Sequence, residues 1–342
     1  MSQNEMERTV AEILVPGKGI LAADESTGTI EKRFKAHDIA NTEENRRDYR
    51  EMLFTAPGMN EHISGVILFE ETLGQKAANG TRLAEILARQ GVVPGIKVDK
   101  GTVPLPKAPG ELVTQGLDGL GERLKTYKQQ GARFAKWRAV ITIGPGIPSA
   151  HCIQVNAHAL ARYAALCQEN GIVPIVEPEV LMDADNTIER CLEVTSDTLE
   201  RTFGELYRQR VVLEQMLLKP NMVVSGKKCA VQAPVDEVAR QTIACFRRVV
   251  PAAVPGIVFL SGGQADEAAT AHLSAMNALG RHPWVLSFSY GRALQAPSLK
   301  AWAGKAAQVK AGQQAFVHRA RLNGLAQKGQ YQPKMEKELA RV

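Results

Sequence analysis

Short runs of apolar and β-branched residues recur along the chain, separated by longer segments in which apolar residues return every three or four positions. The short runs are typical of buried strands, and the longer segments have the period of amphipathic helices. The predicted strands are residues 17–24, 64–70, 94–99, 133–138, 173–179, 216–221, 256–263 and 284–291. Because strands and helices alternate, the pattern favours βαβ units and a parallel sheet.

The number of these runs favours one architecture. Eight parallel strands with a helix between successive strands are typical of a closed β/α barrel, the TIM barrel, in a chain of 342 residues. A doubly wound sheet would show G-x-G-x-x-G after an early strand, whereas the first predicted strand leads into "ADESTG". We therefore expect residues 1–342 to form a single barrel domain.

Three segments outside the strands have clear patterns. Residues 161–170, "ARYAALCQEN", have the period of a helix that stops at Gly171. The alanine-rich residues 299–329 also have helical period and are expected to pack on the barrel exterior. Residues 330–342 are polar and interrupted by proline, so a mobile C-terminal tail is expected there.

Composition excludes several classes of protein. The chain is 44% hydrophobic and 23% charged, as in ordinary soluble proteins. No apolar run approaches the roughly 18 residues of a membrane span, and the N-terminus lacks an apolar signal core, so a cytoplasmic protein without a membrane partner is expected. The net charge of +6 is dispersed and does not predict a nucleic-acid partner. Five scattered cysteines without C-x-x-C predict neither a disulfide framework nor a thiolate metal site.

Charged and small residues stand at the ends of most predicted strands. In a β/α barrel the C-terminal strand ends meet at one mouth, where the active site lies. These residues are Asp24, Glu25, Glu70, Lys97, Asp99, Lys136, Arg138, Glu177, Glu179, Lys219, Ser261, Gly262, Gly263, Ser289, Gly291 and Arg292. Any one alone is more often a solvated rim residue or half of an ion pair, but the convergence of lysines and carboxylates favours a catalytic site.

The lysine of "LLKPNM", Lys219, is the best candidate nucleophile because its neighbours are apolar. Burial and a second nearby cation, for which Lys136 is the candidate, lower the pKa of a lysine, so that it can attack a carbonyl as a neutral amine and form a Schiff base. Glu177 and Glu179 would supply the acid and base that dehydrate the carbinolamine. Asp24 would move the proton of a substrate hydroxyl if the first and last strands pair.

Two glycine-containing loops indicate an anion site. "LSGGQ" (residues 260–264) and "SYGRAL" (residues 289–294) follow the seventh and eighth predicted strands, where barrels commonly hold phosphate on backbone N–H groups. Arg292 can add a bidentate contact. A Gly-Gly pair alone is more often a tight turn, but its location and the arginine favour phosphate.

A second anion site is predicted on the opposite side of the mouth. Lys97 would act there with the hydroxyls of Ser26 and Thr29, which otherwise only cap a helix. Lys32 and Arg33 would lie one turn further along. Two phosphate sites with a Schiff-base lysine between them imply a bisphosphorylated sugar.

The histidines do not predict a metal mechanism. They fall in predicted helices or loops, and no H-x-H or H-E-x-x-H pair is present. We therefore expect no metal and no other cofactor.

The strand-end motifs together resemble one family. "GKGILAADEST", "TEENRR", "GVILFEETL", "GIKVDKG", "FAKWR", "NGIVPIVEPE", "LLKPNM", "FLSGGQ" and "FSYGRALQ" are similar, in this order, to motifs of class I fructose-1,6-bisphosphate aldolase, and the likeness extends over about residues 8–331. The resemblance implies a β/α barrel, a homotetramer and reversible cleavage of fructose 1,6-bisphosphate to dihydroxyacetone phosphate and glyceraldehyde 3-phosphate in glycolysis and gluconeogenesis.

The resemblance also implies a role for each matching residue. Lys219 would form the Schiff base, Asp24 would transfer the proton at the cleaved bond, and Glu177 would dehydrate the carbinolamine. Glu179 and Lys136 would assist. The C1 phosphate would be bound by Ser261, Gly262, Gly291 and Arg292. The remaining substrate and the distal phosphate would be bound by Lys97, Ser26, Thr29, Arg33 and Arg138.

The chain departs from the family pattern at two places. Animal members end in a tail with a terminal tyrosine that helps one proton transfer, whereas this sequence ends in "EKELARV" and its last aromatic residue is Tyr331. Thr29 stands where many relatives carry serine and keeps the hydroxyl. Two alternatives stay open: a Schiff-base aldolase for another ketose phosphate, such as sedoheptulose 1,7-bisphosphate or fructose 1-phosphate, and a binding protein that has lost turnover.

Overall fold

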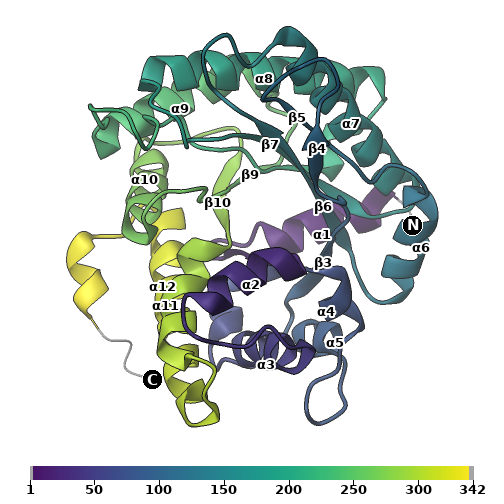
Figure 1. Cartoon of the computed structure of the whole chain (residues 1–342), viewed down its shortest axis with the longest axis vertical. Helices are drawn as coiled ribbons and strands as arrows, with labels where there is room; N and C mark the ends of the chain where they lie inside the picture. Colours follow the sequence, from purple (N-terminus) through teal and green to yellow (C-terminus); the bar gives the residue numbers. More distant parts are fainter. Residues whose placement is uncertain (1–2, 339–342) are drawn as a thin grey trace.

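Eight strands pair side by side and in parallel until the first meets the last, so that the sheet closes into a barrel (Figure 1). The computed structural model describes residues 3–338. The barrel strands are β1 Gly19–Ala23, β2 Ile63–Leu68, β3 Val93–Lys97, β6 Phe134–Ile141, β7 Val173–Val180, β8 Leu217–Leu218, β9 Gly256–Phe259 and β10 Val285–Tyr290. They follow chain order around the barrel, and β1 pairs with both β2 and β10. The predicted TIM barrel and its eight strands are confirmed.

Helices connect the strands and cover the outside of the barrel (Figure 1). The α-helices are α1 Gln3–Ile13, α2 Thr27–Lys35, α3 Glu43–Phe54, α4 Glu70–Gly74, α5 Leu83–Arg89, α6 Leu120–Gln129, α7 Ala150–Glu169, α8 Ile188–Arg208, α9 Val235–Val249, α10 Asp266–Ala278, α11 Arg292–Trp302 and α12 Val309–Gln327. Short 3-10 helices are η1 Met59–Glu61, η2 Leu213–Gln215, η3 Ala306–Gln308 and η4 Pro333–Lys337. Within residues 3–338, none of the helices is long and apolar enough to cross a bilayer.

Apolar side chains fill the N-terminal end of the barrel interior. One buried cluster joins side chains of the strands to side chains of α1: Ile20, Phe134, Ile175, Leu217 and Val258 with Met6, Val10 and Ile13. Helix α1 contacts β2, β3 and β7. Gly95 makes room for the largest of these side chains, because a Cβ there would lie 2.3 Å from the Phe134 ring. This end is therefore closed, and only the C-terminal ends of the strands can open into a site.

The connecting segments agree with the sequence expectation at one place and differ from it at two. Helix α7 does stop before Gly171, whose φ is +66°, as predicted. Residues 299–329 are not one helix, because Ala303 and Gly304 take positive φ between α11 and α12. A small antiparallel hairpin, β4 Thr102–Pro104 and β5 Leu112–Thr114, was not predicted.

The predicted tail lies only partly within the described residues. Residues 339–342 lie outside them. Within the described part, Glu336 of η4 accepts hydrogen bonds from Arg319 of α12 at 2.5 and 2.6 Å and from the Tyr331 hydroxyl at 2.9 Å. The segment up to η4 is thus tied to the barrel exterior by an ion pair.

Candidate active site

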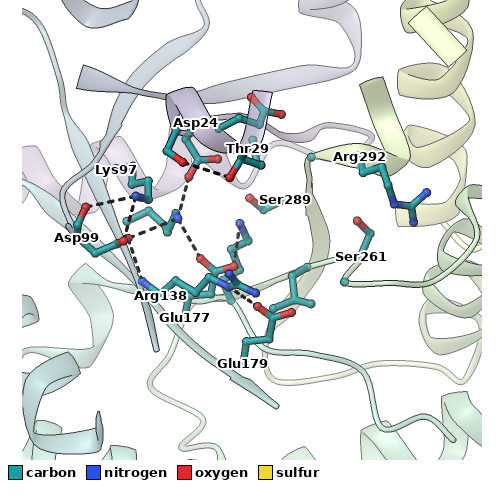
Figure 2. A pocket seen from close by; sticks show the side chains of 18 of the residues that line it. Asp24, Thr29, Lys97, Asp99, Arg138, Glu177, Glu179, Ser261, Ser289 and Arg292 are labelled. Atoms are coloured by element: carbon teal, nitrogen blue, oxygen red, sulfur yellow. Dashed lines mark hydrogen bonds and ion pairs between the residues drawn. The ribbon is translucent and has the colours of Figure 1, made fainter. Parts of the chain in front are cut away.

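A cavity of about 350 Å³ opens at the C-terminal end of the barrel (Figure 2). Every residue to which the family resemblance assigns a role lines it: Asp24, Ser26, Thr29, Arg33, Lys97, Lys136, Arg138, Glu177, Glu179, Lys219, Ser261, Gly262, Gly291 and Arg292. Glu25, Asp99, Gly101, Thr102 and Ser289 lie in the same lining. The structure therefore brings together residues that are spread over most of the sequence.

The alternation of side chains along the strands explains why these charges occur within apolar runs. In β7, Val173 and Ile175 point into the apolar interior, so Glu177 and Glu179, two and four positions later, face the same side. In β8, Leu217 likewise precedes Lys219 by two positions. Strands β7 and β8 thus each place an apolar side chain in the barrel interior and a charged side chain above it, where the cavity begins.

Lys136 lies at the centre of the charged cluster, among the carboxylates of Asp24, Asp99 and Glu177. Its Nζ lies 2.7 Å from Asp24 Oδ2, 3.5 Å from Glu177 Oε2 and 3.7 Å from Asp99 Oδ2, and its side chain is only 4% exposed. In the barrel, β3 and β2 lie between β6 and β1. The contact between Lys136 and Asp24 therefore reaches across two intervening strands. One ammonium therefore links three carboxylates from three strands.

These contacts set the charge of Lys136 and Asp24. Burial by itself lowers the pKa of Lys136, but the carboxylates of Asp24, Glu177 and Asp99 outweigh it and raise that pKa well above the usual range. Burial also raises the pKa of Asp24, yet Lys136, Lys219 and Lys97 outweigh it and hold that pKa well below the usual range. Lys136, which was expected from the sequence to act as a second cation, is therefore a cation held among carboxylates.

Lys219 contacts the same cluster from the next strand. Its side chain is 5% exposed, and its Nζ lies 3.2 Å from Glu177 Oε1. Its backbone N–H donates to the Val176 carbonyl at 2.8 Å, which fixes its register beside Glu177. Glu177 therefore lies between Lys219 and Lys136, within 3.5 Å of both Nζ atoms.

Two further ion pairs flank the cluster. Arg138 pairs with Glu179, which raises the pKa of Arg138 above its usual range despite the opposing effect of burial. Lys97 Nζ lies 3.0 Å from Asp99 Oδ1 and 5.9 Å from the centre of the Phe69 ring. Nearby, the hydroxyls of Ser26 and Thr29 are 3.1 Å apart at the start of α2. This part of the cavity thus combines cations with hydroxyl groups.

The loops after β9 and β10 form the other side of the cavity, where Figure 2 places Ser261 and Arg292. Gly262 takes φ +53°, a conformation that favours glycine. Arg292 begins α11, is 39% exposed, and donates to Asp266 Oδ1 at 2.8 Å and to the Gln264 carbonyl. The Ser289 hydroxyl is buried without a hydrogen-bond partner. This side offers backbone and side-chain donors rather than a packed cluster.

Comparison with known proteins identifies the family. The model of class-I fructose-bisphosphate aldolases matches residues 5–341. A probable class 1 fructose-bisphosphate aldolase of Xanthomonas campestris is 58% identical over 332 residues, which cover 97% of this chain and 99% of the relative. The chain belongs to the class-I fructose-bisphosphate aldolase family.

Two other aldolases agree with this family assignment. A fructose-bisphosphate aldolase of Dictyostelium discoideum is 54% identical over 96% of this chain and 93% of its own length. A fructose-bisphosphate aldolase of Plasmodium falciparum, crystallised with TRAP and a small-molecule inhibitor, superposes with a TM-score of 0.95 at 49% identity, covering 96% of this chain and 95% of that one. The resemblance drawn from the motifs is therefore confirmed over nearly the whole chain.

The cavity lining differs from the sequence prediction at a few residues. Glu70 does not line the cavity, because it begins α4 and contacts Lys100 at 2.9 Å and the Tyr127 hydroxyl at 2.7 Å. Lys32 is exposed and also lies outside the lining. Gly101 and Thr102 were missed, because the hairpin that brings them in has strands of only three residues and no apolar pattern.

Proposed function

We propose that this chain reversibly cleaves fructose 1,6-bisphosphate to dihydroxyacetone phosphate and glyceraldehyde 3-phosphate, with Lys219 as the Schiff-base residue. Family membership supports the reaction. One observation supports the residue: Lys219 is almost fully enclosed in the cavity lining, and a carboxylate oxygen of Glu177 lies 3.2 Å from its Nζ. An amine must lose its proton before it attacks a carbonyl, and Glu177 is within hydrogen-bond reach of that proton.

Formation of the imine uses Lys219 and Glu177. The amine attacks C2 of the ketose, and the resulting carbinolamine loses its hydroxyl as water to give an iminium. Glu177 donates the proton that the leaving hydroxyl needs. Lys136 assists by contacting Glu177 at 3.5 Å, and Glu179 assists by pairing with Arg138, which lies opposite Glu177 in the register of β6 and β7.

Cleavage of the C3–C4 bond uses Asp24. Because Lys136 keeps Asp24 ionised, its carboxylate can accept the proton of the C4 hydroxyl. The C4–O bond becomes a carbonyl, the electrons of the C3–C4 bond move into the iminium, and glyceraldehyde 3-phosphate leaves. The enamine then gains a proton at C3, and hydrolysis of the iminium releases dihydroxyacetone phosphate and frees Lys219.

The two phosphates would lie at opposite sides of the cavity. Ser261, Gly262, Gly291 and Arg292 would bind the C1 phosphate through backbone N–H groups, a hydroxyl and a guanidinium. The distal phosphate and the sugar hydroxyls would contact Lys97, Ser26, Thr29, Arg33 and Arg138. All of these groups line the same cavity as Lys219.

We further propose that the chain acts as a single-domain protomer of a homotetramer in the cytoplasm. The tetramer is proposed from the family resemblance. The location is supported by a relative from Arabidopsis thaliana, named fructose-bisphosphate aldolase 6, cytosolic, which is 55% identical to this chain.

The test is borohydride trapping with dihydroxyacetone phosphate in the presence of EDTA, followed by peptide mass spectrometry. We expect a reduced adduct on Lys219. Lys219→Arg should give no adduct and lose turnover by about 10⁴-fold or more. Lys228→Arg, at an exposed lysine, should behave as wild type. Absence of an adduct on the wild-type chain, with turnover abolished by EDTA, would overturn the mechanism.

A further inference from the structure

The backbone around Asp24 is held by side chains from two helices outside the cavity. Strand β1 ends at Ala23, so the carbonyls beyond it have fewer strand partners. Arg50 of α3 donates from Nε to the Ala23 carbonyl at 3.2 Å and from Nη2 to the Glu25 carbonyl at 3.2 Å. Gln295 of α11 donates from Nε2 to the Ala22 carbonyl at 2.7 Å. The carbonyls on both sides of Asp24 are therefore fixed.

The same two side chains hold the carboxylate of Glu25. Oε2 of Glu25 lies 3.1 Å from Arg50 Nη2, and Oε1 accepts from Gln295 at 2.8 Å and from Arg33. Arg50 is 1% exposed and Glu25 side chain 4% exposed. A guanidinium that is this deeply buried costs free energy unless it is paired, so its contacts must be specific. Neither Arg50 nor Gln295 lines the cavity.

We propose that Arg50 and Gln295 form a clamp that positions Asp24 for the cleavage step. The inference rests on the proposed function, in which Asp24 accepts the proton of the C4 hydroxyl. Asp24 must reach that hydroxyl while it also contacts Lys136 at 2.7 Å, and a single side chain can satisfy both only from a fixed backbone. The two clamp residues act through Asp24 and are positioning residues.

The contacts require an arginine at position 50. A guanidinium has donors spread over a rigid plane. It can therefore donate at once to the Ala23 carbonyl, the Glu25 carbonyl and the Glu25 carboxylate. An ammonium keeps the charge but is a compact group that cannot span the same acceptors. Arg50→Lys therefore preserves the charge opposite Glu25 while releasing part of the backbone.

A matched control lies on the same helix. Arg46, one turn earlier on α3, is also largely buried and donates to both oxygens of Glu71 at 2.8 and 2.5 Å. Within residues 3–338 its other side-chain hydrogen bonds go to Asn41 and not to the end of β1. Arg46→Lys thus removes a buried guanidinium from α3 without releasing the clamp.

The experiment separates imine formation from bond cleavage. Trapping with dihydroxyacetone phosphate needs Lys219 and Glu177 but no proton transfer at a C4 hydroxyl. Arg50→Lys should therefore keep wild-type trapping while its kcat for fructose 1,6-bisphosphate cleavage falls about 10- to 100-fold, the effect of misplacing a catalytic group by about an ångström. Arg46→Lys should keep both. If Arg50→Lys does not fold, Gln295→Met, which removes the contacts to Ala22 and Glu25, should show the same separation.

Three results would overturn the clamp: wild-type cleavage by Arg50→Lys, an equal loss in Arg46→Lys, or a proportional loss of trapping and cleavage in Arg50→Lys. If Arg50→Lys does not fold, wild-type cleavage by Gln295→Met would do the same. Failure of the wild-type chain to form any adduct would instead overturn the proposed function, so the two failures are distinguishable.

Discussion

The two sides of the cavity are built differently. We define the lysine side as Asp24, Lys136, Glu177 and Lys219, and the phosphate side as Ser261, Gly262, Gly291 and Arg292. The lysine side is supported by β6 and β7, which pair from Phe134↔Val173 to Ile141↔Val180. On the phosphate side, β9 ends at Phe259 and loops follow it.

The two sides also differ in how exposed their charged side chains are and in where the partners of those charges lie. The side chains of Lys136, Glu177 and Lys219 are 4 to 5% exposed, and the Glu177 carboxylate contacts both lysines. Arg292 is 39% exposed, and its carboxylate partner, Asp266, lies outside the cavity lining. The lysine side has its charges fixed before substrate arrives, whereas Arg292 must exchange or share a partner to bind a phosphate.

This difference follows from the tasks proposed for each side. Groups that transfer protons act only within a narrow range of positions, and preorganised charges need little rearrangement during the reaction. A phosphate site must release its ligand in every turnover, so solvated and exchangeable contacts suit it. We therefore expect changes on the lysine side to lower kcat, and changes on the phosphate side to raise KM.

Asp24→Asn should give the largest effect of the three changes below. The amide can still accept a hydrogen bond from Lys136 but cannot take up a proton at neutral pH. The kcat for cleavage should fall about 10²- to 10⁴-fold, the usual contribution of a general base. Steady-state cleavage and borohydride trapping should be measured together, because the adduct on Lys219 should persist. A fall in kcat of less than about 10-fold would contradict the assignment of Asp24.

Arg292→Met should act mainly on binding. Loss of one charged hydrogen-bonding group costs about 1.5–3 kcal/mol, which corresponds to a KM for fructose 1,6-bisphosphate raised about 10- to 100-fold. The kcat at saturation should change much less, because Arg292 contacts none of the proton-transfer groups. Arg248→Met, at an exposed arginine of α9, is the control and should leave KM unchanged. A larger fall in kcat than rise in KM would contradict the separation of the two sides.

The sequence could predict the lysine side better than its surroundings. Strand ends follow from short apolar runs, and period-two alternation places Glu177, Glu179 and Lys219 on one face. Distances are not encoded in such a pattern. The sequence therefore identified Lys136 as a second cation but could not show that Asp24, Glu177 and Asp99 all contact it and raise its pKa.

Residues that act from helices were hardest to predict. Arg50 lies in "TEENRRDYREML", a segment rich in charges, and an arginine in such a segment is usually exposed. It is buried only because α3 packs beside the end of β1, a tertiary contact. The hairpin of β4 and β5 was missed for the related reason that strands of three residues show no period.

His272 of α10 gives the smallest expected effect, and it concerns stability on the phosphate side. Its Nδ1 lies 2.7 Å from Gln264 Oε1, and the Gln264 carbonyl binds Arg292. The side-chain Oε1 of Gln264 can only accept a hydrogen bond, so Nδ1 of His272 carries the proton. Nε2 of His272 is then the atom that titrates. Burial lowers the pKa of His272 to about 4, from 6.5.

Acid should therefore weaken the fold through His272. Between the two pKa values the unfolded chain binds a proton that the folded chain does not, so this residue's contribution to stability falls as pH falls, by up to ~1.4 kcal/mol per pH unit. His272→Gln should remove that part of the slope, measured as urea midpoints from about pH 7 to about pH 4. His151→Gln, at an exposed histidine, should keep the wild-type slope. An unchanged slope in His272→Gln would mean that His272 does not contribute to the acid sensitivity of the fold, and would contradict the lowered pKa.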